Sequence, residues 1–325
     1  MILSILREYC RIARLRAPRR PDVSDRLLFP LNIRMLKKIV AVLLTSFTAA
    51  AFAAVPLGSQ SVLVVEDGTG KVLLEKNANA QVPIASLTKL MTAMVVLDAK
   101  QNMDEKIAID HTDVDMLKHS ASRVPVGAEI SRGDVLQLAL MSSDNRAAAS
   151  LARTYPGGAD AFKNAVKAKI RTLGMTQTVI EEPTGLSPHN MSTATDLVKM
   201  ASAAAAYPDI RRITTDTKDV INIKGRKVEY HNTNRLVGAK GWDVGLSKTG
   251  YTEEAGRCLI MRFKSAGRNA TLVLLNAKAN SARLMDAVNI RRFIAGPDEK
   301  PKVMKASVTR HKKAVKAGKR SRRAM

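Results

Sequence analysis

Residues 242–277 read WDVGLSKTGYTEEAGRCLIMRFKSAGRNATLVLLNA and contain three strand-like runs. The runs cover 242–250, 256–264 and 269–277, and a short turn sequence, SAGR, joins the last two. Apolar runs separated by Gly, Asn and Ser are typical of neighbouring strands joined by tight turns. This segment therefore predicts a meander of three strands, and the rest of the chain can be assigned around it.

Helical patterns occupy most of the chain between an N-terminal hairpin and this meander. The hairpin is predicted over 61–77, where two β-rich runs flank the turn sequence DGTG. Strands from both ends of the chain with helices between them predict one α+β domain with an antiparallel sheet over 54–297. The helices are predicted, from apolar residues at helical spacing, over 86–99, 132–141, 159–175, 193–207 and 282–294.

The N-terminal segment reads as a targeting sequence rather than as part of the fold. MLKKIVAVLLTSFTAAAFA (35–53) combines two lysines, an apolar stretch and small residues at Ala51 and Ala53, as a cleaved secretory signal does. The mature chain is then expected to begin at Ala54. An uncleaved membrane anchor is the alternative, although the apolar stretch falls short of the ~20 residues that span a bilayer. Residues 1–34 would be unusual before such a signal and are interpreted as a start-site artefact.

The formal net charge of +24 is concentrated at the two ends of the chain. Residues 300–325 carry eleven Lys or Arg and no acid, whereas residues 54–299 hold 32 basic and 26 acidic residues. The segment 298–325 is therefore predicted to be a disordered basic tail that makes at most loose contact with a membrane surface or cell wall. It has no aromatic residue on which bases could stack, so specific nucleic-acid binding is not expected.

Residues that form disulfides or bind metals are sparse in the mature chain. Cys258 is its only cysteine, which excludes an intramolecular disulfide and is more typical of a small buried apolar residue. No histidine has zinc-ligand spacing to another ligand, so neither a metal nor a cofactor is expected and a metal hydrolase is disfavoured. The histidines considered are His111, His119, His189, His231 and His311.

The candidate chemistry begins with Ser86 and Lys89 in PIASLTKL (83–90). On a helix, residues three apart lie on one face, ~5–6 Å apart at Cβ, so a hydroxyl and an amine at this spacing can exchange a proton. The helix N-terminus adds positive potential at Ser86. A lysine acts as a base only if burial or a nearby cation lowers its pKa, and Lys248 is the leading candidate for that cation.

Two further motifs follow in order along the chain. Ser143-Asp144-Asn145 lies at a turn after a predicted helix, and Lys248-Thr249-Gly250 lies on a predicted strand. With Ser86-x-x-Lys89 they form the trio that marks penicillin-binding proteins and class A β-lactamases. Each motif alone is weak, but the three together, on a helix start, a turn and a strand, are specific.

The chain resembles the serine D-Ala-D-Ala peptidases of low molecular mass, and among them the endopeptidases. The likeness covers roughly residues 58 to 295 and is strongest in LALMSSDNRAAASLA, EPTGLSPHN and KTGYTEEAGRCLIMR, with Val82 where an arginine would be expected. The resemblance implies a β-lactamase/transpeptidase-like fold with its site between the sheet and a helical region. It also implies peptidoglycan peptides as substrates, β-lactams as covalent inhibitors and a periplasmic location.

The resemblance implies roles for the motif residues in acylation. Ser86 would attack the D-Ala carbonyl and form an acyl-enzyme, Lys89 would accept its proton, and Ser143 would relay a proton to the departing amine. Substrate binding would fall to the remaining positions. Asn145 would hold Lys89 or the substrate amide, and Lys248 and Thr249 would bind a carboxylate or polarise Ser143. Gly250 would let the backbone approach, and the amides of Ser86 and Tyr251 would form the oxyanion hole.

Several alternatives remain open at this point. Tyr230-His231-Asn232 also fits a variant of the middle motif, but it lies only 16 residues before Lys248. A β-lactamase would need an acid to activate water, for which Glu181 and Glu182 are the candidates. A carboxypeptidase that trims pentapeptides is the main alternative function. The tail over 298–325 is expected to be too short and too polar to form a second domain or a membrane-surface helix, which favours the endopeptidase. An inactive fold that docks on the cell wall through its tail is a further alternative.

Overall fold

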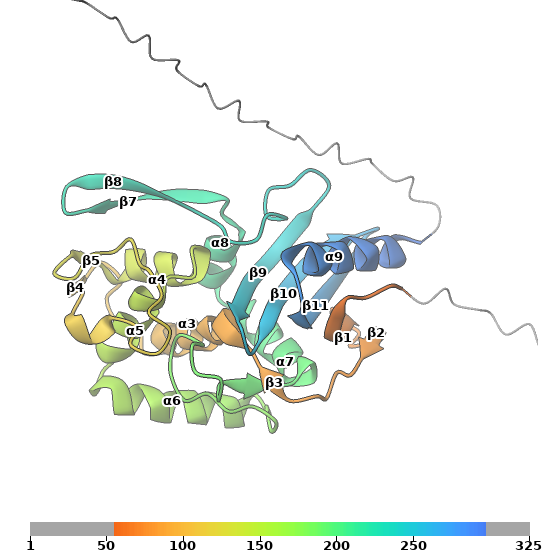
Figure 1. Ribbon diagram of the computed structural model, residues 1–325, viewed down its shortest axis with the longest axis horizontal. Coiled ribbons are helices and arrows are strands. Elements are labelled where there is room, and N and C mark those ends of the chain that lie inside the picture. The colour runs from red at the N-terminus through yellow and green to blue at the C-terminus, as the bar shows by residue number, and fades with distance from the viewer. Residues whose placement is uncertain (1–54, 297–325) are drawn as a thin grey trace, which may run out of the picture. The chain divides into compact units, whose positions relative to one another are not determined.

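The computed structural model describes residues 55–296, and its α+β architecture confirms the predicted fold class (Figure 1). A five-stranded antiparallel sheet has the order β2-β1-β11-β10-β9. The predicted hairpin and meander join within it, because β1 pairs with β11 and Val62 lies opposite Leu274. The strands are β1 (Ser59–Glu66), β2 (Val72–Lys76), β9 (Asp243–Thr252), β10 (Gly256–Ser265) and β11 (Arg268–Ala277).

Helices cover both faces of this sheet. Most of them follow one another along the chain on one face, and the C-terminal helix α9 packs on the other through Ala287 and Ile290 (Figure 1). A short 3₁₀ turn, η1 (Ala85–Thr88), precedes the first long helix. The helices are α3 (Lys89–Asp98), α4 (Arg132–Met141), α5 (Asn145–Arg153), α6 (Gly158–Thr172), α7 (Ala194–Ala204), α8 (Pro208–Thr215) and α9 (Asn280–Ala295), with a 3₁₀ turn η2 (His111–Asp113).

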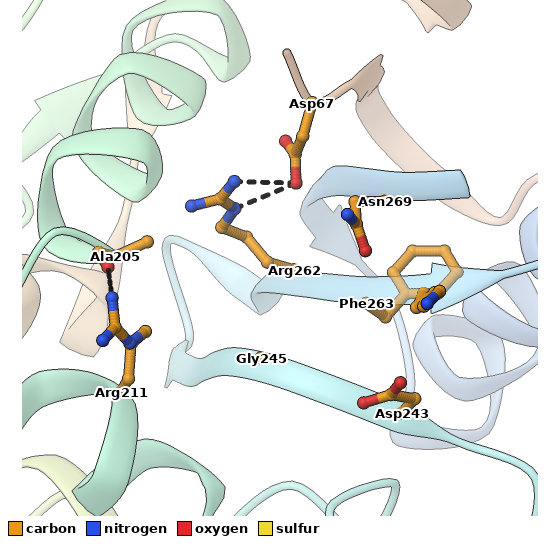
Figure 2. Close-up of a pocket in the computed structure, with 9 residues that line it drawn as sticks. Asp67, Ala205, Arg211, Asp243, Gly245, Arg262, Phe263 and Asn269 are labelled. Atoms are coloured by element: carbon orange, nitrogen blue, oxygen red, sulfur yellow. Dashed lines mark hydrogen bonds and ion pairs between the residues drawn. The ribbon is translucent and has the colours of Figure 1, made fainter. Parts of the chain in front are cut away.

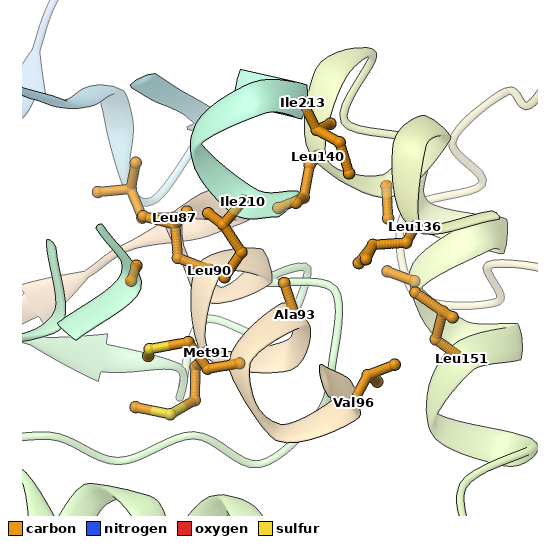
Figure 3. Close-up of a cluster of buried hydrophobic side chains, with 14 of the residues drawn as sticks. Leu87, Leu90, Met91, Ala93, Val96, Leu136, Leu140, Leu151, Ile210 and Ile213 are labelled. Atoms are coloured by element: carbon orange, nitrogen blue, oxygen red, sulfur yellow. The ribbon is translucent and has the colours of Figure 1, made fainter. Parts of the chain in front are cut away.

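Helix α3 is the centre of the larger hydrophobic core. Every residue from Lys89 to Val96 is buried, and apolar side chains of α4, α5 and α8 surround the helix (Figure 3). Its sequence, KLMTAMVVLD, is apolar on nearly all sides, as expected of a helix enclosed by protein rather than of a surface helix. The burial of α3 matters for the site, because it removes Lys89 from water.

The structure adds elements that the sequence analysis missed. The helix predicted over 193–207 ends at Ala204. Pro208 does not only end this helical pattern but also begins a further helix, α8, because proline is well accommodated at the first helical position. A two-stranded hairpin of β7 (Lys218–Ile223) and β8 (Arg226–His231) then follows. Short pairs also join β3 (Val82–Pro83) to β6 (Met191–Ser192) and β4 (Lys106–Ala108) to β5 (Glu129–Ser131).

Three predictions concern residues outside the described range and stay predictions: the start-site artefact over 1–34, the signal peptide over 35–53 and the basic tail over 298–325. Within residues 55–296, no helix has the length and apolar character needed to cross a membrane.

Candidate active site

Ser86 lies in the 3₁₀ turn that leads into α3. The sequence predicts a helix that begins at Ser86, whereas the α-helix itself begins at Lys89. The turn is held from both sides. Ala85 adopts a left-handed backbone with φ of 48°, and the backbones of Gly185 and Gly250 approach it closely. The Ser86 side chain is half-buried at the inner end of the candidate site.

The Lys89 amine joins the first two motifs. Its Nζ lies 2.9 Å from Ser86 Oγ, 2.6 Å from Asn145 Oδ1 and 2.7 Å from the carbonyl oxygen of Thr184. Burial lowers the pKa of Lys89 to about 8, against the opposing charges of Glu182, Asp144 and Asp115. A substantial fraction of this lysine is therefore neutral near physiological pH.

The three partners of Lys89 decide where its lone pair points. A neutral amine has two N–H donors and one lone pair. The carbonyl oxygens of Asn145 and Thr184 can only accept hydrogen bonds, so they take the two N–H groups. The lone pair is left facing the Ser86 hydroxyl, which is the geometry of a general base beside a nucleophile.

Lys248 lies on β9 and contacts the middle motif. Its Nζ donates to Ser143 Oγ at 2.8 Å and to the carbonyl oxygen of Thr249 at 3.0 Å. Burial lowers the pKa of Lys248 well below its usual value, and the charges of Lys89 and Arg283 lower it further. Ser143 is itself in a left-handed conformation with φ of 61°, which is uncommon for a residue other than glycine and is typical of functional turns.

Burial and a nearby cation are the two causes expected to lower the pKa of Lys89, and burial is the main one. The reason is the position of Lys89 inside the enclosed helix α3, where its charge loses water whether or not a second cation is near. The charge of Lys89 in turn lowers the pKa of the buried Lys248.

The edge strand β9 lies against the Ser86 turn at Thr249, Gly250 and Tyr251. Thr249 Oγ1 donates to Thr233 Oγ1 at 2.7 Å. A Cβ on Gly250 would lie 3.1 Å from the backbone nitrogen of Ser86, so only glycine allows this approach without a shift. The Tyr251 ring is half-exposed beyond it, and the Arg257 guanidinium stacks 3.5 Å from its centroid.

Glu182 orders the loop that supplies the Thr184 carbonyl. Its carboxylate accepts hydrogen bonds from the backbone amides of Thr184 at 2.7 Å and Gly185 at 2.6 Å, and from Asn190 Nδ2 at 3.0 Å. From the sequence, Glu182 is a candidate only for the water-activating acid of a β-lactamase. Its contacts show instead that it orders the loop that carries Thr184 and Gly185.

The rival motif Tyr230-His231-Asn232 lies in and just after the β7–β8 hairpin. Asn232 Nδ2 donates to the carbonyl oxygens of Thr214 and Asp216, both at 3.0 Å, and Arg123 stacks on the Tyr230 ring. These contacts tie the hairpin to α8 and do not reach Ser86 or Lys89, so the middle motif of this site is Ser143-Asp144-Asn145.

Gly185→Ala should destabilise the protein and slow acylation of Ser86. Gly185 has φ of +86°, and a Cβ there would lie 1.9 Å from the carbonyl oxygen of Ala85, so the Ser86 turn must move. Backbone strain of this kind costs about 1–3 kcal/mol before any clash is counted. Chemical denaturation and the rate of penicillin acylation measure the two effects.

Gly267→Ala is the matched control for Gly185. Its φ is +78°, but nothing lies within 4 Å of the added Cβ, so it carries the conformational cost without the clash. Equal losses of stability and acylation rate in the two variants would contradict the role given to the Gly185–Ala85 contact.

Two of the surface hollows within residues 55–296 differ in whether a motif residue lines them. A pocket of about 170 Å³ between residues 112–117 and 182–186 is lined by Asn145. A larger pocket of about 230 Å³ is lined by charged residues of the sheet and α8, none of which belongs to the motifs (Figure 2). There Arg262 pairs with Asp67 at 2.8 Å. The larger hollow therefore lacks a nucleophile beside a base, whereas the smaller one adjoins Lys89 through its lining residues Asn145 and Thr184.

The chain is similar in sequence and in fold to known D-alanyl-D-alanine peptidases. A D-alanyl-D-alanine endopeptidase of Pseudomonas aeruginosa is 46% identical over 240 residues, which are 73% of this chain and 77% of that protein. One of Escherichia coli is 42% identical over 270 residues, 82% of this chain and 87% of that protein. A mutant of the Streptomyces K15 DD-transpeptidase superposes with a TM-score of 0.68 at 26% identity, covering 73% of this chain and 98% of that structure.

These relatives confirm the resemblance drawn from the three motifs. The family model described as D-alanyl-D-alanine carboxypeptidase matches residues 48–279, which is most of the chain. The chain belongs to this family of serine peptidases, peptidase family S11.

Proposed function

We propose that this protein is a serine D,D-endopeptidase that hydrolyses D-alanyl cross-links in peptidoglycan through an acyl-enzyme on Ser86. The observation that carries the proposal is the buried Lys89 amine, whose two carbonyl partners direct its lone pair at the Ser86 hydroxyl 2.9 Å away. That arrangement activates a serine without a histidine or a metal.

Acylation begins when Lys89 accepts the Ser86 proton as Oγ attacks the D-Ala carbonyl. Negative charge develops on the carbonyl oxygen, and the backbone amides of Ser86 and Tyr251 are the donors proposed to bind it. The close approach of Gly250 to the Ser86 turn supports this, because it brings the two stretches of backbone together. Collapse of the intermediate breaks the amide bond, and water later hydrolyses the ester on Ser86.

The departing amine must receive a proton, and Ser143 is proposed to relay it: Ser143 gives its O–H proton to the amine as it takes one from the Lys248 ammonium. Ser143 Oγ accepts a hydrogen bond from Lys248 Nζ at 2.8 Å, which leaves its own O–H available to donate to a leaving group. Lys248 and Thr249 also provide a cation and a hydroxyl on β9 for a substrate carboxylate. Asn145 holds Lys89 and lines the pocket that receives substrate.

The choice of endopeptidase over carboxypeptidase follows the relatives. Three relatives named endopeptidase are 46%, 42% and 35% identical to this chain, whereas carboxypeptidases of Bacillus subtilis and Escherichia coli are 28% and 27% identical. A periplasmic location after signal cleavage, and a basic tail in loose contact with wall or membrane, are part of the same proposal. β-Lactams would acylate Ser86 as substrate mimics.

Digestion of purified, cross-linked peptidoglycan tests which bond is cut. We expect cross-linked muropeptide dimers to fall to monomers on incubation with the protein, and penicillin to block the reaction. Chromatography with mass spectrometry of the fragments measures both. Dimers that persist while terminal D-Ala is released from pentapeptides would identify a carboxypeptidase instead.

A further inference from the structure

The side-chain amide of Asn145 can serve Lys89 in only one of its two orientations. Its oxygen accepts a hydrogen bond from the Lys89 amine at 2.6 Å, whereas its NH₂ group could only donate. If the amide turned by 180°, two donor groups would face each other. Lys89 would then keep a single carbonyl partner, Thr184, and its lone pair would no longer be directed at Ser86.

Ser120 lies on the other side of this amide. Asn145 Nδ2 donates to Ser120 Oγ at 2.8 Å. A hydroxyl could in principle accept that bond or donate in its turn, so Ser120 alone does not choose the orientation of Asn145. The Lys89 amine fixes the oxygen side of the amide, and Ser120 accepts from its NH₂ side only while Ser120 Oγ is held at that place.

Asp115 holds the backbone of Ser120 in place. The Ser120 backbone amide donates to the Asp115 carboxylate at 2.8 Å, and an ionised carboxylate has acceptors only. Desolvation acts to raise the pKa of Asp115, but hydrogen bonding from Ser120 and from the backbone amides of Lys118 and Leu117 holds it below its usual value. Asp115 therefore fixes the stretch of backbone that presents Ser120 Oγ to Asn145.

The loop that carries these residues is fastened at three places. Asp115 accepts the backbone amides of Leu117 and Ser120, both at 2.8 Å, which closes the loop on itself. Ser122 Oγ donates to Asp144, the capping residue of α5, at 2.8 Å. Lys118 forms an ion pair with Glu254 in the turn after β9. Ser120 is thus presented to Asn145 by a braced segment.

We infer that Asp115 and Ser120 are positioning residues for the Lys89 base. They act through one chain of contacts. Asp115 accepts the backbone amide of Ser120, Ser120 Oγ accepts from Asn145 Nδ2, and Asn145 Oδ1 accepts from Lys89. This inference rests on the proposed function of Lys89, and it assigns a role to a loop outside the three motifs.

Ser120→Ala tests the inference with penicillin as the probe. We expect the acylation rate to fall about three- to tenfold, the worth of one hydrogen bond. We also expect the rise of that rate with pH to move to lower pH, because the Lys89 ammonium loses an acceptor that stabilises it. The charges that face Lys89, namely Glu182, Asp144, Asp115 and Lys248, are unchanged in this variant.

Two control variants distinguish a positioning role of the Ser120 hydroxyl from a general loosening of the loop that carries it. Ser120→Thr keeps the hydroxyl and should restore both the rate and the pH profile. Ser122→Ala removes a hydroxyl of the same loop that contacts Asp144 and not Asn145, so its pH profile should match the wild type. An unchanged rate and profile in Ser120→Ala, or the same shift in Ser122→Ala, would overturn the inference.

The outcome is distinguishable from failure of the proposed function. If Ser86→Ala is inert toward penicillin while Ser120→Ala behaves as the wild type, only the positioning role is wrong. If the Ser86→Ala variant is still acylated by penicillin, the nucleophile itself is wrongly assigned.

Discussion

Ser86→Ala is expected to abolish covalent labelling by penicillin and to leave the fold intact. Among the atoms of residues 55–296 that lie within hydrogen-bond reach of Lys89 Nζ, Ser86 Oγ alone can become a nucleophile, since the other two partners are carbonyl oxygens. The hydroxyl is half-buried and faces the site, so its removal costs little packing. A fluorescent penicillin measures labelling, and thermal unfolding followed by circular dichroism measures the fold.

Ser142→Ala is the matched control for this experiment. Ser142 lies at the end of α4, close to the middle motif, but its hydroxyl bonds the carbonyl oxygen of Leu138 at 2.8 Å and does not contact Lys89. It should label at close to the wild-type rate. Labelling of Ser86→Ala at the wild-type rate would mean that the acyl group is carried by another residue.

The parts of the site that were predictable are those with a fixed residue type at a fixed spacing. Ser86 and Lys89 are neighbours because a helical turn brings residues three apart together, and Lys248 reaches Ser143 because β9 is the edge strand beside the α4–α5 turn. Sequence alone carries both relations, through the periodicity of a helix and the order of three motifs.

The contacts that escaped prediction involve backbone groups and loops. Thr184 serves Lys89 through its carbonyl oxygen, a group that every residue has, so no residue type marks it. Glu182 shapes that loop by accepting backbone amides, and Ser120 reaches Asn145 from 25 residues away. Such pairs depend on how loops pack, which neither spacing nor composition encodes.

The missed elements of the fold have a different explanation, because the sequence does contain signals for them. Pro208 ends one pattern and begins another, and proline fits both readings because it lacks an N–H that only a helix interior requires. In the β7–β8 hairpin, Ile221 and Ile223 alternate with exposed polar residues before Lys224-Gly225, so a strand signal was present. The burial of α3 on nearly all sides was also readable from KLMTAMVVLD, and with it the lowered pKa of Lys89.

The second large effect is expected from Lys89, in two variants that separate its basicity from its charge. Lys89→Ala should lower the acylation rate by about 10²–10⁴, the usual contribution of a general base. Lys89→Arg should lose a similar amount although it keeps a positive charge, because a guanidinium stays protonated and has no lone pair to offer. Stopped-flow acylation by a chromogenic β-lactam measures both rates.

The pH dependence of the wild-type rate follows from the same assignment. Only the neutral amine can take the Ser86 proton, and burial lowers the pKa of Lys89 to about 8. The acylation rate should therefore rise as pH increases through about 8 and level off above it, and this rise should be absent in Lys89→Ala. Lys199→Ala, which alters a lysine on α7 that pairs with Asp196, is the control and should keep the wild-type profile.

A loss of less than about threefold in Lys89→Ala would be far below the 10²–10⁴ of a general base and would assign the proton transfer to another group. Lys248 would then be the next amine to test, because it lies on the opposite wall of the site and is also buried with a lowered pKa.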